Sequence, residues 1–379
     1  MKIITMKLIQ VIKKFFRRVL GKVRRLPAEW QFKIYEKKFN GKPYTPFLQQ
    51  EIQLAIKNRR DIYFHNEKTA KDIADSWKGE VSKPKSLRFI ENAIPVVMSA
   101  NEDFAPYMAV MLQSLLDNSN PQRKYHFIVF ERNFSDKTKN ILIDQVSSFF
   151  YCAIDFVCTE NAFNEIPIAT SKGFHFSVDT FSRLFIPYWL DKYPKVIYCD
   201  GDMLAKADIA ELYDVDILDK CMAATVTPSF AKDIEKQQYN TFYASSPVYL
   251  LIENWSRYIN AGLLVFDTKN FLKKLSYQDM FKFAIYYTNR YKKHMNDQDV
   301  LSVLIKEDYF ILPPEWNCLW HHEFENGQRW QVVPNVKIIH FSSDVKPWKT
   351  IAEIENNQLV VAYRNYANKV PLYTSLCKR

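Results

Sequence analysis

Two aspartates, one residue apart, follow a short apolar run, and their spacing suits the binding of a divalent cation. The run Val196–Cys199 predicts a buried strand, and Asp200, Gly201 and Asp202 come directly after it. Because side chains alternate along an extended backbone, Asp200 and Asp202 point to the same side, while Gly201 leaves room for a ligand. Carboxylate oxygens are the ligands that hard cations prefer. The competing interpretation is an ordinary turn, which the tripeptide alone favours.

A histidine and a lysine near the carboxyl end of the chain could serve the same chemistry. His340 lies near the end of the apolar run Val336–Phe341, which predicts another strand, and Lys346 follows six residues later. A histidine there can bind a metal ion, although a hydrogen-bonded structural histidine is the more common case. Lys346 is either a counter-ion for a phosphate group or a solvated loop charge.

Three further positions have both a functional and a structural interpretation. Arg183 lies in an apolar, helix-like run and needs a charged partner, which is a carboxylate near the metal site or, as we favour, a structural acid. Asn260–Gly262 are small residues leading into a strand, which fits close approach to a ligand or a turn or bulge. Asp297 fits the N-cap or first turn of a helix that ends at Ile305, but it could also face a ligand.

The elements that must position these residues alternate between strands and helices. The predicted strands are Ile94–Ala100, His126–Phe130, Ala153–Val157, Val196–Cys199, Cys221–Val226 and Tyr258–Phe266, and the predicted helices include Tyr107–Leu116, Asp136–Ser148 and Phe271–Tyr291. This alternation predicts an α/β fold, with a parallel sheet and helices on both faces. Ligands of such sheets bind beyond the carboxyl ends of the strands, where Asn101–Phe104 and Asp200–Asp202 lie.

The net charge of +10 comes almost entirely from one short segment. Met1–Leu26 holds nine Lys and Arg residues and no acid, and its apolar residues recur at helical spacing. A basic amphipathic helix of this kind binds an anionic membrane surface or packs its apolar stripe on the body of the protein, and we favour the membrane. The rest of the chain is nearly neutral, which argues against a nucleic-acid partner.

The sequence also argues against a zinc site, a transmembrane helix and a glycine-rich nucleotide loop. The six Cys are scattered without a CxxC pair, which argues against a zinc site and indicates a reducing, cytoplasmic environment. No apolar window approaches about 18 residues, so no transmembrane helix is expected. The chain has neither a Walker A motif nor a GxGxxG fingerprint, so a nucleotide would have to be held in another way.

We divide the chain into four segments. They are a basic amphipathic helix at 1–27, a helical extension and linker at 28–92, the α/β domain at 93–349 and a C-terminal helical tail at 350–379. Within the extension, Lys68–Trp77 fits a short helix. Within the domain, Pro228–Glu253 predicts a long loop of the kind that often carries function.

Taken together and in order, these motifs resemble those of glycosyltransferase family 8, the retaining GT-A enzymes. The resemblance runs from about Ile94 to Lys349 and rests on Val97–Phe104, Phe181–Leu184, Tyr198–Asp202, Asn260–Gly262, Asn296–Asp299 and His340–Trp348. It implies a GT-A domain, a Rossmann-like, mostly parallel central sheet flanked by helices, which binds a UDP-sugar donor with Mn²⁺. Mg²⁺ is the alternative metal, although it prefers oxygen ligands to an imidazole.

The resemblance also implies how the leaving group would be held. Asp200, Asp202 and His340 match the family's metal ligands, and Lys346 matches its diphosphate contact. Breaking the bond between a hexose and a nucleoside diphosphate leaves a highly charged diphosphate. A divalent ion that bridges both phosphates, with the point charge of Lys346 beside it, would stabilise that group as its charge develops.

Further roles concern the nucleoside and the donor sugar. Asn101 and Asp103 fall where the family binds the base and ribose. Arg183 and Asn260 fall where it contacts the donor sugar and nearby carboxylates. The other residues of these motifs that are expected to line the donor site are Phe104, Gly201, Ala261 and Ser343.

The sugar chemistry is implied for Asp297 and Gln298. Asp297 matches a sugar-hydroxyl contact, and Gln298 matches the residue near the anomeric carbon. The sugar would pass through an oxocarbenium-like state. A neutral amide is a poor nucleophile, so we favour attack by the acceptor on the same face, with Gln298 stabilising the sugar cation and the departing phosphate oxygen taking the acceptor's proton.

The sequence also departs from the family pattern in two places. Many relatives have Asp, Asn and Tyr where this chain has Asn101, Asp103 and Phe104, which leaves base selectivity open. The segment Ala224–Pro228 lacks an Asp that galactosyl-transferring relatives often carry, so the donor is either glucose or galactose.

The leading hypothesis is a Mn²⁺-dependent retaining hexosyltransferase, peripheral on the cytoplasmic face of the membrane. Its acceptor would be a cell-surface glycan or glycolipid, such as a lipopolysaccharide core or capsule intermediate. One alternative keeps the fold but transfers sugar to a protein or to the enzyme itself. Another is a catalytically silent, membrane-associated binding module.

Overall fold

The structure is a computed structural model in which most of the chain is described. The described residues are 67–79, 83–84, 87–168, 178–227, 255–291, 296–320, 335–342, 345–349 and 355–376. The amphipathic helix predicted at 1–27, the extension as far as residue 66, the loop Pro228–Glu253 and Ser343 lie outside these ranges. What the sequence indicates for them stays a prediction.

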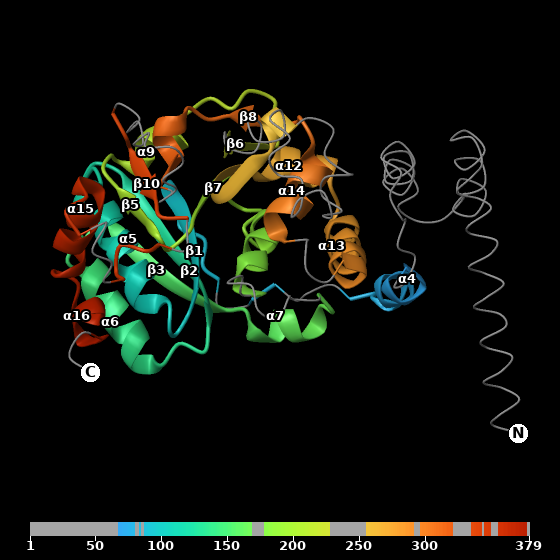
Figure 1. Ribbon diagram of the computed structural model, residues 1–379, viewed down its shortest axis with the longest axis horizontal. Helices are drawn as coiled ribbons and strands as arrows, with labels where there is room; N and C mark the ends of the chain where they lie inside the picture. Colours follow the sequence, from blue (N-terminus) through green and yellow to red (C-terminus); the bar gives the residue numbers. More distant parts are fainter. Residues whose placement is uncertain are drawn as a thin grey trace, which may run out of the picture.

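A seven-stranded sheet forms the centre of the fold, with its strands in the order β3-β2-β1-β4-β7-β6-β8 (Figure 1). The strands are β1 (Ala93–Asn101), β2 (Lys124–Arg132), β3 (Cys152–Cys158), β4 (Lys195–Cys199), β6 (Met222–Val226), β7 (Ile259–Asp267) and β8 (Phe310–Ile311). The strand pairs of this sheet are parallel except for those of β7, which is antiparallel to β4 and β6. The predicted α/β fold with a mostly parallel sheet is therefore confirmed.

The reversed strand β7 brings a second set of polar residues to the carboxyl edge of β4. Leu263, in the middle of β7, pairs with Cys199, the last residue of β4, so the first half of β7, with Asn260–Gly262, extends beyond this edge. The backbone N–H of Asp200 donates to the carbonyl of Gly262 at 2.8 Å. A parallel strand in this place would put Asn260–Gly262 at the opposite edge of the sheet, so the reversal is what joins the two motifs.

A second, three-stranded sheet carries His340 to the same edge. β10 (Ile338–His340) pairs antiparallel with β5 (Met203–Ala205) and parallel with β9 (Cys318–Leu319). His340 lies opposite Met203, the residue after Asp202. The strand predicted at Val336–Phe341 is therefore present in part, but it belongs to this small sheet.

Helices cover both faces of the central sheet. One buried cluster packs beneath α5 (Ala105–Asp117), α6 (Asp136–Ser147), α9 (Ile209–Tyr213), α15 (Gln358–Ala367), α16 (Pro371–Leu376) and the 3₁₀ helix η4 (Pro314–Asn317). The cluster on the other face packs against α4 (Glu67–Ser76), α7 (Glu160–Glu165), η1 (Val178–Phe185), α8 (Ile186–Trp189), α12 (Thr268–Lys274), α13 (Tyr277–Tyr291) and α14 (Asp297–Ile305). A short 3₁₀ helix, η3 (Trp255–Arg257), precedes β7.

The single helix predicted at Phe271–Tyr291 is wrong, because two helices, α12 and α13, occupy this part of the chain. Asp267 caps α12 by accepting from the N–H of Asn270. The Ser276 hydroxyl then accepts from the N–H of Asp279 at the start of α13, at 3.1 Å. Serine is a preferred capping residue, so a new helix begins here.

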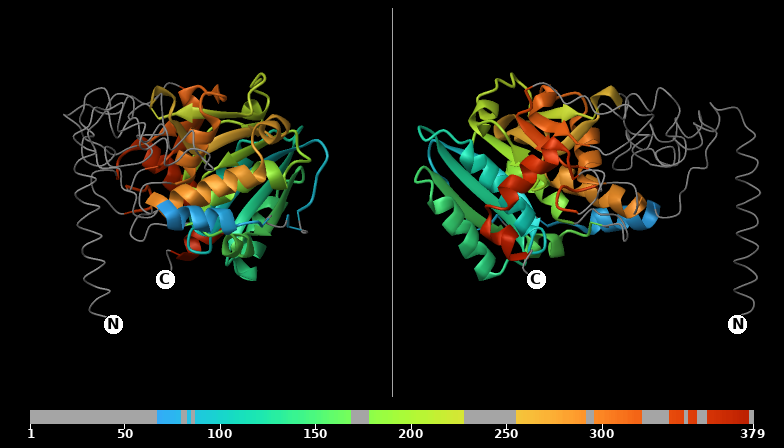
Figure 2. Two further views of the ribbon diagram at one scale, coloured as in Figure 1. Left: turned by 90° about the vertical axis from the view of Figure 1, so that its right-hand side faces the viewer. Right: turned by 60° about the vertical axis from the view of Figure 1, so that its left-hand side comes forward.

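The helix predicted at Lys68–Trp77 is present as α4, which lies along α13 (Figure 2). Ala70 and Ala74 are buried, and the Trp77 ring centroid lies 6.1 Å from that of Tyr277 and 6.0 Å from that of Phe281. This end of the extension thus shares a core cluster with the α/β domain. None of the described helices combines the length and the apolar character needed to cross a membrane.

Candidate active site

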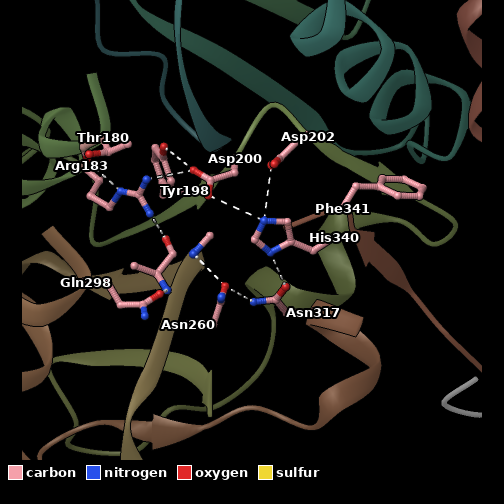
Figure 3. A network of polar contacts seen from close by, with 12 residues as sticks. Thr180, Arg183, Tyr198, Asp200, Asp202, Asn260, Gln298, Asn317, His340 and Phe341 are labelled. Atoms are coloured by element: carbon pink, nitrogen blue, oxygen red, sulfur yellow. Dashed lines mark hydrogen bonds and ion pairs between the residues drawn. The ribbon is translucent and has the colours of Figure 1, made fainter. Parts of the chain in front are cut away.

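Asp200, Asp202 and His340 converge at the carboxyl edge of β4 (Figure 3). Their ligand atoms, one from each residue, lie within 4.8 Å of one another. His340 Nε2 is 3.3 Å from Asp202 Oδ1 and 3.9 Å from Asp200 Oδ2. Two carboxylates and an imidazole nitrogen at this spacing can hold a divalent cation, which a turn alone would not require.

Gly262 makes this convergence possible. A Cβ atom at Gly262 would lie 2.3 Å from His340 Cε1 and 2.9 Å from Asp200 Oδ2, which is closer than real side-chain atoms pack. A Cβ at Gly201 would lie 3.0 Å from both Met108 Cβ and Phe104 Cε1. At both glycines the close neighbour is protein: His340 and Asp200 at Gly262, and Met108 and Phe104 at Gly201. The room for a ligand that the sequence suggested at Gly201 is therefore filled by the protein itself.

Asp202 is held in its ionised form by two neighbours. Burial would raise the pKa of this carboxyl, but Lys346 and His340 together hold it well below its usual value. Lys346 Nζ donates to Asp202 Oδ2 and to the carbonyl of Phe341, both at 2.6 Å. Of the two interpretations of Lys346, a solvated loop charge is therefore excluded in this structure.

Arg183 pairs with two carboxylates of the site. It is 4% exposed. Its Nη2 is 3.0 Å from Asp200 Oδ1 and its Nε is 3.0 Å from Asp297 Oδ2. Nη1 donates to the carbonyl of Ala261, and the Tyr198 hydroxyl donates to Asp200 Oδ1 at 2.7 Å. The separate structural acid that we favoured from the sequence is wrong, because both ion-pair partners belong to the site.

Asp297 and Gln298 open helix α14, but Asn296 is its N-cap. Asn296 and Asp299 form a reciprocal capping box, so Asp297 lies in the first turn and its side chain is not the cap. Asp297 is 4% exposed, and burial, only partly offset by Arg183, raises the pKa of its carboxyl. Gln298 Oε1 accepts from the N–H of Ala261 at 3.0 Å.

Asn317 contacts both His340, one of the candidate metal ligands, and Asn260 on β7. It was not found from the sequence. Its Nδ2 donates to Asn260 Oδ1 at 2.8 Å and to Thr225 Oγ1 at 3.0 Å. Its Oδ1 lies 3.0 Å from His340 Nδ1. Asn317 ends a short 3₁₀ turn, and no residue pattern around it signals a role. Only its contacts with residues far away in the chain reveal it.

The residues proposed to hold the nucleoside lie at the start of α5. Asn101 Oδ1 accepts from the N–H of Phe104 at 3.0 Å, and Asp103 is exposed. Glu102 turns away from the site, since its carboxylate accepts hydrogen bonds from the start of α6. The Phe104 ring centroid lies 6.0 Å from that of Trp348, in the segment that follows β10.

The predicted residues thus fall into two groups. Those within one network of polar contacts are Asp200, Asp202, His340, Lys346, Arg183, Asp297, Gln298, Asn260 and Ala261. Asn101, Asp103 and Phe104 lie between the end of β1 and the start of α5, where the Phe104 ring is close to Gly201. Ser343 is outside the described residues.

Comparisons with known proteins identify the family of this chain. The model of the family described as Glycosyl transferase family 8 matches residues 95–352. A putative glycosyltransferase from Haemophilus influenzae is 27% identical over 215 residues, which cover 56% of this chain and 59% of that protein. A lipopolysaccharide 1,2-glucosyltransferase from Escherichia coli is 23% identical over 256 residues, covering 65% of this chain and 71% of that protein. The match to the first relative therefore spans less than two thirds of its length.

A solved structure shares the fold. The galactosyltransferase LgtC, in complex with donor and acceptor sugar analogues, superposes with a TM-score of 0.55 at 20% identity. The superposition covers 73% of this chain and 96% of that one. The described sheet and helices therefore have the GT-A architecture.

Proposed function

Because the chain belongs to glycosyltransferase family 8, we propose that it is a Mn²⁺-dependent retaining hexosyltransferase that takes glucose or galactose from a UDP-sugar. One observation carries the proposal. Asp200, Asp202 and His340 place their ligand atoms within 4.8 Å of one another, and the Lys346 ammonium lies beside them, 2.6 Å from Asp202. Such a site suits a diphosphate leaving group and the cation that accompanies it.

The residues present fit the metal that the family implies. Because Gly262 has no side chain, His340 and Asp200 can approach each other over it. Asp202 is kept ionised although it is largely buried. The mixed set of carboxylate and imidazole ligands favours Mn²⁺ over Mg²⁺. When bound, the cation would offset the negative charge that develops on the departing diphosphate.

Lys346 adds a second positive charge on the same side. Its ammonium now satisfies Asp202 and the carbonyl of Phe341. With a donor bound, we propose that it turns to the diphosphate and supplies a charge that is already in place when the bond breaks. Asn101, Asp103 and Phe104 would hold the base and ribose at the start of α5.

The donor sugar would lie beside Asp297 and Gln298. Asp297 is ion-paired with Arg183 and would accept from a sugar hydroxyl rather than attack the anomeric carbon. Gln298 has its amide oxygen fixed by Ala261 and, as a neutral amide, would stabilise the sugar cation. We propose attack by the acceptor on the same face as the leaving group. A glycosyl adduct trapped on Asp297 or Gln298 would contradict this mechanism.

The acceptor would be a cell-surface glycan or glycolipid, such as a lipopolysaccharide core or capsule intermediate. The support is the likeness to the Escherichia coli protein named above and the basic segment Met1–Leu26, which would bind the cytoplasmic face of an anionic membrane. Deleting residues 1–26 should release the protein from anionic vesicles in a flotation assay. Unchanged vesicle binding would contradict the membrane contact.

The donor chemistry is tested by UDP release. Wild type should release UDP from UDP-glucose or UDP-galactose with Mn²⁺, and Asp202→Ala should lower this rate by about 10²–10³-fold, the typical effect of removing one stabilising group. Asp219→Ala is the matched control, because the Asp219 side chain is 89% exposed. Activity that survives Asp202→Ala would contradict the metal assignment.

The same assay separates the alternatives. Incubation with a labelled UDP-hexose and no acceptor should leave the protein unlabelled, whereas labelled protein would favour a self-glycosylating transferase. If no UDP-hexose gives Mn²⁺-dependent UDP release, a silent binding module becomes the better description.

A further inference from the structure

We infer that Asn317 is a positioning residue that fixes which atoms of His340 and Asn260 face the active site. The inference rests on the proposed function, since it concerns the same metal and sugar positions. Asn317 is 3% exposed and its amide lies between the two residues. A buried amide must satisfy its donors and acceptors with nearby partners, so its orientation is set by them.

The orientation is decided by a backbone N–H, which can only donate. The N–H of Gly262 donates to the side-chain oxygen of Asn260 at 3.0 Å. Asn260 must therefore keep Oδ1, not its NH₂ group, on this side. The Asn317 atom that lies 2.8 Å from the same oxygen must then be Nδ2, because two oxygens without a proton between them would repel each other.

The orientation of Asn317 in turn fixes His340. With Nδ2 on Asn260, the Asn317 oxygen lies on His340 Nδ1 at 3.0 Å, so Nδ1 must carry a proton. The nitrogen left for a metal ion is then Nε2, which is the nitrogen that faces Asp202 and Asp200. A hydrogen bond at the second ring nitrogen is the usual way in which proteins orient a metal-binding histidine.

The same amide leaves Asn260 with only one free function. Its Oδ1 is occupied by Gly262 and Asn317, so its NH₂ group is the part that can reach a ligand. Asn260 would therefore act as a hydrogen-bond donor to the oxygen of a sugar hydroxyl. One side chain, Asn317, thus fixes both which nitrogen of His340 faces the metal position and which group of Asn260 faces the sugar position.

Two substitutions of Asn317 separate these effects. Asn317→Asp keeps an oxygen for His340 Nδ1–H but loses the donor to Asn260, whereas Asn317→Leu loses both. Mn²⁺ affinity, followed by the electron paramagnetic resonance signal of free Mn²⁺, should fall about 10–100-fold in Asn317→Leu and stay equal or become tighter in Asn317→Asp. The KM for the UDP-sugar should rise about tenfold in both variants.

Two further variants test whether the effect passes through the histidine. In a His340→Ala background, Asn317→Leu should change Mn²⁺ affinity by less than about twofold, because the route to the metal is already removed. Thr225→Val removes the third partner of the Asn317 amide but not the other two, and its Mn²⁺ affinity should stay within about twofold of wild type. Thermal unfolding identifies any variant that fails to fold.

The outcomes distinguish this inference from the proposed function. If wild type binds no Mn²⁺ and releases no UDP, the proposed function fails. If wild type binds Mn²⁺ but both Asn317 variants weaken Mn²⁺ affinity equally, Asn317 has only a packing role. The same conclusion follows if Asn317→Leu weakens Mn²⁺ affinity by the same factor with and without His340. Retention of wild-type Mn²⁺ affinity in Asn317→Leu would also overturn the inference.

Discussion

Two largely buried aspartates of the site have pKa values that shift in opposite directions. Asp202 lies with His340 and Lys346, here called the metal side, and Asp297 lies with Arg183 and Gln298, here called the sugar side. Asp202 is 9% exposed and Asp297 is 4% exposed. Burial raises the pKa of both carboxyls. Lys346 and His340 outweigh burial at Asp202, whose pKa is lowered, whereas Arg183 offsets burial only in part at Asp297, whose pKa stays raised.

The difference follows from how many partners stabilise each carboxylate. Asp202 has the Lys346 ammonium at 2.6 Å and the His340 ring at 3.3 Å. Asp297 shares one guanidinium with Asp200, because Arg183 contacts both at 3.0 Å. Asp202 therefore stays ionised, whereas Asp297 has to share its one counter-charge with Asp200, so burial still raises its pKa.

Removing the shared cation tests this balance most strongly. In Arg183→Met, Asp297 and Asp200 would lose the guanidinium that lies between them, and the Arg183 side chain is only 4% exposed, so little solvent is there to replace its charge. The free energy of unfolding should fall by about 3–5 kcal/mol, as expected when one partner of a buried ion pair is removed. Urea denaturation at neutral pH measures this change.

Arg132→Met is the matched control. Arg132 contacts Asp179 at 2.7 and 2.9 Å, but its side chain is 28% exposed, against 4% for Arg183. Solvent screens such a pair, so the loss should be about 1 kcal/mol or less. Equal losses in the two variants would mean that burial of the sugar side does not set it apart.

The start of α14 supplies a pH test of the same region. Burial raises the pKa of Asp299 to about 7, although Tyr258 and the N–H of Asn296 hydrogen-bond to its carboxylate. In the unfolded chain this carboxyl should titrate near its ordinary pKa of about 3.9. As pH rises from about 4 to about 7, the unfolded state loses its proton first, so the native state loses stability over this window.

Asp299→Asn should remove this part of the pH dependence. The amide oxygen can still accept from the N–H of Asn296, while the NH₂ group takes the place of the oxygen beside Tyr258, whose hydroxyl can accept as well as donate. No proton is lost on either side of the folding equilibrium. Relative to the variant, wild type should lose on the order of a few kcal/mol between pH 4 and pH 7, measured by urea denaturation at each pH. Parallel profiles for the two proteins would show that Asp299 is solvated rather than enclosed.

The grouping of Asp200, Asp202 and His340 could be predicted from the sequence only by taking several motifs together, because each motif alone also fits a structural role. Asp200 and Asp202 follow an apolar run at a two-residue spacing, and His340 lies near the end of another such run. Asn317 and the role of Gly262 could not be predicted, because they depend on the reversed strand β7 and on contacts between distant segments. Local periodicity gives the type of each element but not the direction of a strand within the sheet.

A methyl group at Gly262 tests the contact between β7 and the metal side. The Cβ of Gly262→Ala would lie 2.3 Å from His340 Cε1, so the ring must move and β7 cannot follow without breaking its pairing with β4. The unfolding free energy should fall by about 1–3 kcal/mol, the usual result of overpacking a buried site. Mn²⁺ affinity should fall with it, by about 10–100-fold.

Ala261→Gly is the control for Gly262→Ala, since it changes the neighbouring β7 residue without adding an atom near His340. Its Mn²⁺ affinity should stay close to that of wild type, although the strand loses some stability. A Gly262→Ala protein with wild-type Mn²⁺ affinity would show that His340 is free to shift and that the close packing is not needed for the metal.

Lys346→Met should have the smallest effect on stability and the most informative effect on binding. The Lys346 side chain is 19% exposed, so losing its ion pair with Asp202 should lower the unfolding free energy by about 1 kcal/mol or less. The ammonium competes with a metal ion for the Asp202 carboxylate. Mn²⁺ affinity without donor should therefore rise several-fold, while the affinity for UDP falls.

Lys349→Met removes the same charge from the same segment and should change neither of these affinities. If Mn²⁺ binding to Lys346→Met is unchanged or weaker, Lys346 does not occupy the cation's place, and the contrast between the two sides of the site rests on His340 alone.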